Sequence, residues 1–357
     1  MKRHRTFTHI AFADSLDSVY TVFFKSMLIL SLVILTAPVI QGCHKHEHPQ
    51  DSVFTEVPQK SSVKLAVRQS EGMQIRSVDA FVFNDDALQR IDCYQKCDGL
   101  TDGQILVGSS SGKKIVLLCA NAPWSKKDWE DVSSYTKASS VRMELEDEDR
   151  EYPTMSATAH ITAGGKEEIT LERLTSEVVL KSIRCDFSGK PYEGEEITDA
   201  KVYLININAT CRLTPTDNEP IERIINHGNL IQEDMNKFKS LNFVFSNLGT
   251  IKLSHTYPDV RFLCYPNTST EESIGTPFTR LVVEGKIQGE TWYWPININR
   301  NKETDHEGII RNRRYNYDIT IRSKGTKDPD RPIIPEMAET IFTIEKWKEK
   351  NPYQVSF

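Results

Sequence analysis

Hydrophobic and polar positions alternate with a period of two in short runs from residue 61 onward. The plainest run is residues 315–322, YNYDITIR, in which aromatic and aliphatic side chains alternate with polar ones. Residues 63–68, VKLAVR, follow the same pattern. Successive side chains of a β-strand point to opposite faces of its sheet, so this alternation indicates strands with one buried and one hydrated face.

Other strand patterns are more apolar and less regular. They fall at residues 78–83, 114–120, 178–187, 201–207, 241–245, 261–265, 279–287 and 291–294. Helical periodicity is sparse and is strongest in residues 126–137 and 229–238. Many short strands between turn residues predict an all-β fold of stacked antiparallel sheets with few short helices.

Turn and hinge residues divide this pattern into parts. The turn Ser188–Pro191 falls near mid-chain, and a proline-rich segment at residues 329–335 follows the last core strand. A final β-like stretch occupies residues 339–357. The sequence therefore predicts sandwich domains over residues 61–187 and 188–325, followed by a hinge and a C-terminal arm over residues 326–357.

The first 43 residues have the pattern of an export signal. Basic residues at positions 2–5 precede an apolar run at residues 27–40, which is shorter than the roughly 20 residues needed to span a bilayer. Ile40-Gln41-Gly42-Cys43 resembles the lipobox of bacterial lipoproteins. We therefore predict a signal peptide over residues 1–42, cleavage between Gly42 and Cys43, and palmitate-type acylation of Cys43. The alternative is a short membrane anchor with a chance cysteine.

Composition narrows the function further. Residues 43–60 are polar and contain two prolines, which indicates a tether between a lipid anchor and the folded part. The formal net charge of −6 argues against a nucleic-acid binder, which would carry a basic patch. Six cysteines remain besides Cys43. Cys119, Cys185 and Cys264 lie in apolar runs as small hydrophobic residues, and the pairing of Cys93 with Cys97 stays open.

A search for catalytic or metal-binding motifs gives no complete one. Residues 108–113, GSSSGK, have one residue too few between the glycines for a phosphate loop, which favours a turn between strands. The acidic run 144–149 lacks the spacing of a calcium loop, which favours a solvated turn. Alternate histidines at 44, 46 and 48 could chelate a metal weakly, but a polar spacer is the favoured interpretation. We therefore expect no enzyme activity, no cofactor and no metal.

Two tryptophans offer the one candidate surface for sugar stacking. Trp292 and Trp294 share one face of the strand at residues 291–294. A sandwich core would use them equally well, and we favour the core.

Several segments, taken in series, resemble the fimbrillins of Bacteroides-type bacteria, the subunits of type V pili. The lipobox is one match. The others are Val78–Asp85, Lys114–Asn121, Thr170–Val179, Cys264–Asn267, Arg280–Gly285, Trp292–Pro295 and Arg311–Gly325, which follow the family's order and span most of the chain after Cys43. The resemblance implies two transthyretin-like Greek-key β-sandwich domains in a lipoprotein that is assembled outside the cell.

The resemblance also implies how the subunits join. In these pilins a first strand fills a groove in its own subunit, a protease cutting after arginine removes it, and the C-terminal arm of another subunit replaces it. Residues 61–68 are the candidate first strand, and Arg68 and Arg76 are the candidate cleavage sites, of which Arg68 is preferred. The candidate donor is the arm 339–357, with Ile341, Phe342, Ile344 and Trp347 as its apolar side chains.

The leading interpretation is a structural stalk or tip subunit of a surface fimbria, located at the outer membrane and supporting adhesion. Its expected partners are other fimbrial subunits, the membrane through the lipid, and receptors on host or bacterial surfaces. Two alternatives stay open. One is a membrane-retained anchor subunit that keeps Cys43 and its first strand, and the other is a lipid-anchored glycan-binding protein.

Overall fold

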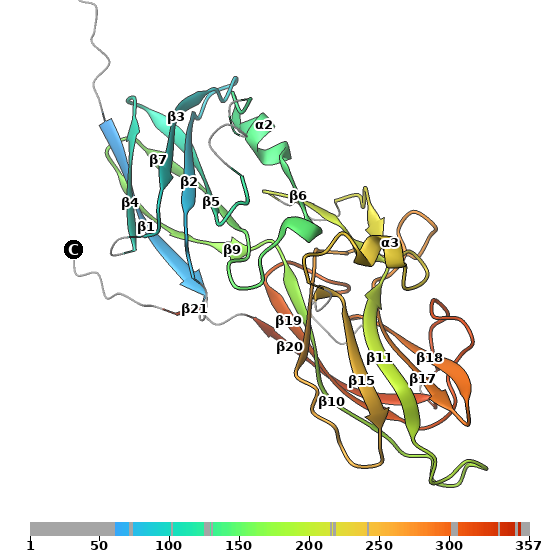
Figure 1. The fold of residues 1–357 in the computed structure, drawn as a ribbon. Coiled ribbons are helices and arrows are strands. Elements are labelled where there is room, and N and C mark those ends of the chain that lie inside the picture. The colour runs from blue at the N-terminus through green and yellow to red at the C-terminus, as the bar shows by residue number, and fades with distance from the viewer. Residues whose placement is uncertain are drawn as a thin grey trace, which may run out of the picture. The chain divides into compact units, whose positions relative to one another are not determined.

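The computed structural model describes residues 61–70, 74–100, 103–124, 129, 131–214, 216, 219–240, 243–300, 306–334, 336–346 and 349–350. The signal, Cys43, the tether histidines and Trp347 lie outside these residues. No helix among the described residues is long and apolar enough to cross a membrane. Strands dominate the described part of the chain, which contains two short helices, α2 (Tyr135–Ser140) and α3 (Gln232–Met235), so the predicted all-β class is confirmed (Figure 1).

The N-terminal half folds into two facing sheets. Their strands are β1 (Ser61–Ser70), β2 (Val78–Asn84), β3 (Ile91–Cys97), β4 (Gln104–Ser109), β5 (Lys113–Ala120), β7 (Met155–Thr162), β8 (Lys166–Thr170) and β9 (Glu172–Arg173). One sheet has the order β3-β2-β5-β7-β9, and in the other β1 pairs with both β4 and β8. A short C-terminal strand, β21 (Glu349–Lys350), pairs with the end of β1.

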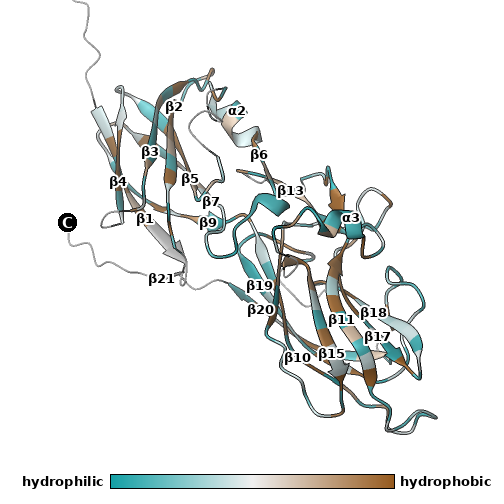
Figure 2. Cartoon of the chain, viewed as in Figure 1, coloured by the Kyte–Doolittle hydropathy of each residue, from teal (hydrophilic) through white to brown (hydrophobic). Residues whose placement is uncertain are grey.

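Strands β2 and β5 are buried on both faces. One face packs against β1, β4 and β8, and the other packs against residues such as Trp129, Ala138 and Leu145. This double burial explains why residues 78–83 and 114–120 read as continuous apolar runs, not as alternating ones. Apolar residues gather on β2, β5 and β11 in Figure 2.

The C-terminal half forms a second pair of sheets. Their strands are β10 (Ser176–Cys185), β11 (Ile197–Ile205), β15 (Phe245–Ile251), β16 (Val260–Cys264), β17 (Arg280–Ile287), β18 (Glu290–Asn297), β19 (Arg313–Ile321) and β20 (Ala338–Lys346). The orders are β16-β10-β19-β20 and β15-β11-β17-β18. Tyr315, Tyr317, Val283 and Trp294 lie in the core that the strands enclose.

Small elements link these sheets. Strand β6 (Arg142–Glu144) pairs with β13 (Thr210–Arg212), and β12 (Ile207–Asn208) pairs with β14 (Ile224–Ile225). A 3-10 turn, η2 (Leu145–Asp147), follows β6. The β6–β13 ladder joins a segment that precedes β7 to one that follows β11, so the halves share backbone hydrogen bonds.

Three expectations about element positions need correction. Among the described residues of the helix expected at 126–137, α2 begins at Tyr135, where the Ser134 hydroxyl accepts a hydrogen bond from the Lys137 amide at 3.3 Å and caps the first turn. The strand expected at residues 241–245 begins at Phe245 and continues to Ile251. The second expected helix, within residues 229–238, shortens to α3.

The strand pairing also bears on the expected domain boundary. The first domain was expected to end after residue 187 and therefore to contain β10. Instead β10 pairs antiparallel with β16 and parallel with β19, and so lies in the second pair of sheets. Parallel pairing joins strands that are distant in the sequence, and local patterns carry no signal for it. Where the chain divides into domains stays a prediction.

Candidate assembly site

Strand β1, the candidate first strand, is an interior strand of its sheet. Residues 61–66 pair antiparallel with β4, from Ser61↔Ser109 to Ala66↔Gln104. Residues 64–68 pair parallel with β8, from Lys64↔Lys166 to Arg68↔Thr170. Both backbone edges of β1 are therefore occupied, and its removal would leave β4 and β8 with facing unpaired edges.

The inward side chains of β1 complete the core between the sheets. Val63 and Leu65 are 0% exposed and Val67 is 6% exposed. They pack in one cluster with aliphatic residues of β2 and β5, including Val82 and Leu118. Burying three aliphatic side chains stabilises a fold by roughly 5–8 kcal/mol. β1 is thus an integral part of this half, and it fills a groove with an apolar floor.

Arg68 lies within β1 at its last pairing with β8. The strand continues through Gln69 and Ser70, so the bond after Arg68 lies inside a strand. The pairing partner beyond Arg68 is β21: Gln69 is in register with Lys350, and Ser70 with Glu349.

Arg76, the second candidate cleavage site, is exposed but held in place. Its guanidinium carbon lies 3.8 Å from the centre of the Tyr152 ring, and its Nη2 lies 3.9 Å from Asp149 Oδ2. Its backbone amide donates a 2.8 Å hydrogen bond to Asn121 Oδ1. The adjacent backbone is fixed by this turn, which makes Arg76 a poorly placed substrate for a protease.

The segment expected to be a separate C-terminal arm is paired with the core. Strand β20 pairs antiparallel with β19 along its length, from Ala338↔Ile321 to Lys346↔Arg313. The core strands were expected to end before Gly325, and this expectation is wrong because β20 belongs to the same sheet as β19. The hydrophobic pattern predicted a strand at β20, but it did not predict the partner strand, because pairing with β19 depends on long-range packing.

The inward face of β20 packs on two core tyrosines. The Phe342 ring centre lies 5.0 Å from that of Tyr317 and 6.2 Å from that of Tyr315. Ile344 is also half-buried, whereas Ile341 is 62% exposed on the outer face. Phe342 and Ile344 therefore lie on the inward face of β20, and Ile341 lies on the outward face.

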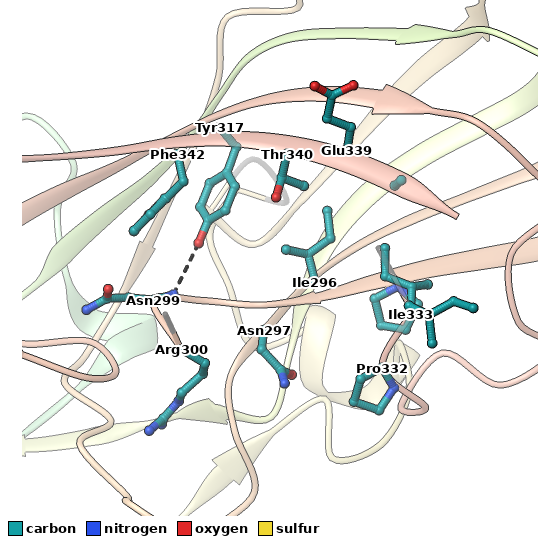
Figure 3. A pocket seen from close by; sticks show the side chains of 13 residues that line it. Ile296, Asn297, Asn299, Arg300, Tyr317, Pro332, Ile333, Glu339, Thr340 and Phe342 are labelled. Carbon is teal, nitrogen blue, oxygen red and sulfur yellow. Dashed lines mark hydrogen bonds between the residues drawn. The ribbon is translucent and has the colours of Figure 1, made fainter. Parts of the chain in front are cut away.

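A cavity lies beneath the first half of β20. Its volume is about 520 Å³, and it lies between β20, the end of β18 and residues 332–334. Figure 3 shows the Tyr317 ring reaching from β19 toward Asn299, whose backbone amide donates a 3.3 Å hydrogen bond to the Tyr317 hydroxyl. β20 is held by its ladder with β19 and by the packing of Phe342 on Tyr315 and Tyr317.

The side chain of Asp330 fixes the segment before β20 to the core. Asp330 Oδ1 accepts hydrogen bonds from Asn206 Nδ2 at 2.7 Å and from Arg280 Nη1. The Arg280 side chain is 2% exposed and also pairs with Glu272. A buried guanidinium needs such partners, so Asp330 anchors the chain ahead of the segment that leads to β20.

A buried carboxyl group links the two halves. Glu148 is 3% exposed; its Oε2 accepts from the Thr154 amide at 2.9 Å and its Oε1 from the Tyr265 hydroxyl at 2.8 Å. Burial raises the pKa of Glu148 to about 7, although these hydrogen bonds oppose the rise. The group is part of the run 144–149, in which Glu146 also pairs with Arg223 at 2.6 Å. The expected solvated turn is thus a structured contact.

Other candidate residues have structural roles. Lys114 is buried, with its Nζ 2.6 Å from both Asn84 Oδ1 and Ser110 Oγ, which fixes the turn that resembled a phosphate loop. Trp294 is 0% exposed and donates to the Ser323 carbonyl at 2.9 Å, so the core interpretation is confirmed for it. Trp292 is half-buried, with Lys327 Nζ 3.5 Å from its ring centre.

The described cysteines form no disulfide. All six of them are free, and Cys93 and Cys97 lie on β3 four positions apart, which separates them by roughly 13 Å. No group of three or more His, Cys, Asp or Glu side chains in the described part of the chain is arranged to hold a metal ion.

Sequence reasoning missed the strands that flank β1. β8 reads KEEIT and resembles a polar loop, because only Ile169 among its residues is buried. In β4 the apolar Leu106 stands at an outward position and is 61% exposed, so hydrophobic and polar residues do not alternate along this strand. The glycine turn at 164–165 was the one available signal for β8.

No protein-family model matches the sequence, and no curated protein matches it. Solved structures do match. A fimbrilin from Porphyromonas gingivalis superposes with a TM-score of 0.58 at 12% identity, over 80% of this chain and 97% of that one. Candidate cell adhesion proteins from Parabacteroides distasonis and Bacteroides eggerthii each superpose with a TM-score of 0.61 at 15% identity, over 81% of this chain. The likenesses cover 97% and 96% of those two chains, so this chain has the fold of fimbrilins and of these candidate cell adhesion proteins.

Proposed function

We propose that this chain is a subunit of a surface fimbria, exported as a lipoprotein and assembled by donor-strand exchange in support of adhesion. The observation that carries the proposal is the place of β1 between β4 and β8, with Val63, Leu65 and Val67 buried beneath it. A strand so placed can be replaced only by another strand that pairs on both edges and fills the same apolar floor.

The donor in this proposal is the C-terminal segment of another copy. β20 is an edge strand that pairs only with β19 among the described strands, and a cavity lies under it, so its release breaks one ladder. The segment begins after Asp330, which stays anchored by the buried Arg280. The expected donor residues Ile341, Phe342 and Ile344 lie on β20, and Trp347 follows it.

The glycan-binding alternative has lost its main support. It required Trp292 and Trp294 to present an open aromatic platform, and Trp294 is buried in the core. The lysine above Trp292 covers the remaining ring. The likeness in fold to a fimbrilin favours the assembly role over an enzymatic one.

Surface material from cells, run on gels without boiling, tests the proposal. Wild-type protein should form a ladder of denaturant-resistant polymers, and its mature N-terminus by mass spectrometry should be Gln69. Arg68→Ala should abolish the ladder, whereas Arg76→Ala, the matched control, should retain it. Deletion of residues 339–357, which removes the donor residues on β20 and the segment after it, should also abolish the ladder.

Two results would contradict the proposal in different ways. A ladder that survives both Arg68→Ala and the deletion would refute exchange through these segments. A wild-type protein that forms no ladder and keeps an acylated Cys43 would instead be a membrane-retained anchor subunit. Cys43→Ala should accumulate as unprocessed precursor, and normal maturation of that variant would refute the lipoprotein assignment.

A further inference from the structure

The backbone of β1 is paired along its entire length, by three different strands in turn. β4 pairs with residues 61–66, β8 with residues 64–68, and β21 with Gln69 and Ser70. The peptide bond that follows Arg68 lies where the pairing passes from β8 to β21. Figure 1 shows β21 beside the end of β1.

A protease binds its substrate as an extended strand and needs backbone groups that are free to pair with its own cleft. Residues already paired in a sheet must therefore open before they can be cut. On the far side of the bond after Arg68, the residues that must open are Gln69 and Ser70, and their partners are Lys350 and Glu349.

We propose that β21 is an autoinhibitory strand: while the C-terminal segment is folded on its own chain, it keeps the bond after Arg68 from being cut. The inference rests on the proposed function and adds an order of events to it. The C-terminal segment must leave β1 before β1 can be removed. A subunit therefore opens its groove only after its own donor segment has been released.

The geometry gives this order a physical consequence. Without β1, the facing edges of β4 and β8 and the aliphatic floor would be open to any available strand. β21 lies at the end of that groove, so the chain's own C-terminal segment would be the nearest strand to fill it. Departure of this segment before cleavage removes the intramolecular competitor, and the groove then accepts a strand from a second copy.

Limited proteolysis of the full chain by an arginine-specific protease tests the inference. The rate at which Gln69 appears as a new N-terminus is followed by mass spectrometry. The test variant is Glu349→Pro/Lys350→Pro, which removes both backbone amide donors of β21 and leaves β20 unchanged. A second test variant ends at Lys346. The matched control is Ser356→Pro, which adds a proline to the same segment outside β21.

Both test variants should be cut after Arg68 roughly tenfold faster than wild type, the factor expected from losing one or two backbone hydrogen bonds. Ser356→Pro should be cut at the wild-type rate, and cleavage after the other arginines should not change in any variant. Equal rates after Arg68 in wild type and both test variants would overturn the inference and leave the proposed processing intact. Absence of cleavage after Arg68 in every chain would overturn both.

Discussion

The Tyr265 hydroxyl donates a 2.8 Å hydrogen bond to Glu148 Oε1, and this contact ties the end of β16 to a segment that precedes β7. The carboxyl group is buried and its pKa is raised to about 7, so much of it is neutral near neutral pH. The link between the two halves therefore contains a group that titrates in the physiological range.

Glu148→Gln should flatten the pH dependence of stability. Because the folded-state pKa of Glu148 lies above its unfolded value, the group is most favourable to folding at low pH, and stability falls as pH rises from about 4.5 to 7. The loss should reach about 3 kcal/mol above pH 7, and the neutral amide avoids it. Urea unfolding at pH 5 and pH 8 measures the effect.

Glu151→Gln, at an exposed position nearby, is the control and should keep the wild-type profile. A Glu148→Gln protein whose stability falls between pH 5 and pH 8 as steeply as that of the wild type would show that Glu148 does not cause the dependence.

Truncation of the central inward side chain of β1 should destabilise the protein strongly. Leu65 is 0% exposed, and Leu65→Ala should cost about 2–5 kcal/mol because it leaves a cavity between the sheets. Lys64→Ala, on the outer face of the same strand, should change stability by about 0.5 kcal/mol or less. Denaturant midpoints measure both. Similar small costs for the two variants would mean that β1 does not fill the groove.

Loss of Phe342 should weaken β20 more than loss of its neighbour. Phe342 is half-buried against Tyr315 and Tyr317, so Phe342→Ala should cost about 1–3 kcal/mol. Ile341→Ala removes an exposed side chain and should cost about 0.5 kcal/mol or less. Amide hydrogen exchange should then rise across residues 338–346 in the first variant only. If the amides of β20 stay equally protected from exchange in Phe342→Ala, then the hydrogen bonds with β19 alone hold β20 in place.

Removal of the hinge anchor should loosen the segment between Asp330 and β20. Asp330→Ala leaves the buried Arg280 with Glu272 as its remaining ion-pair partner. The protein should lose about 1–3 kcal/mol of stability, and not more, because the side chain of Asp330 is itself 35% exposed. Hydrogen exchange at residues 331–338 should rise. Arg331→Ala, at an exposed neighbouring position, should leave exchange unchanged, and equal effects of the two would argue against an anchor at Asp330.

Strands with one buried and one solvated face could be predicted from the sequence. Strands that form only because they pair with a distant strand could not. Tyr315 and Tyr317 alternate with polar residues because one face of β19 is in the core, and this pattern is local. β8 has one buried residue, Ile169, and becomes a strand through its pairing with β1. Its propensity carries no such signal, because strand formation depends on neighbours as much as on composition.

The candidate site shows the same limit. The alternation of Val63 and Leu65 revealed a strand with a buried face, but the two strands that enclose it and the pairing of Gln69 with Lys350 are long-range contacts. The free C-terminal arm was expected because prolines precede it. Those prolines do not prevent pairing of the later residues, and Phe342 packs on aromatic residues that sequence proximity does not connect to it.

The parallel pairing of β10 with β19 governs the order in which the halves can form. When the chain is synthesised or exported from its N-terminus, β10 appears well before its parallel partner β19, residues 313–321, which appears only near the end. The strands of the first pair of sheets other than β21 are complete once Arg173 has appeared. Because ladders between distant strands form slowly, the first half can be folded while both edges of β10 still lack a partner. During that interval an apolar strand, with Val178 and Leu180 at its centre, depends on β16 or on a chaperone to keep it from other chains.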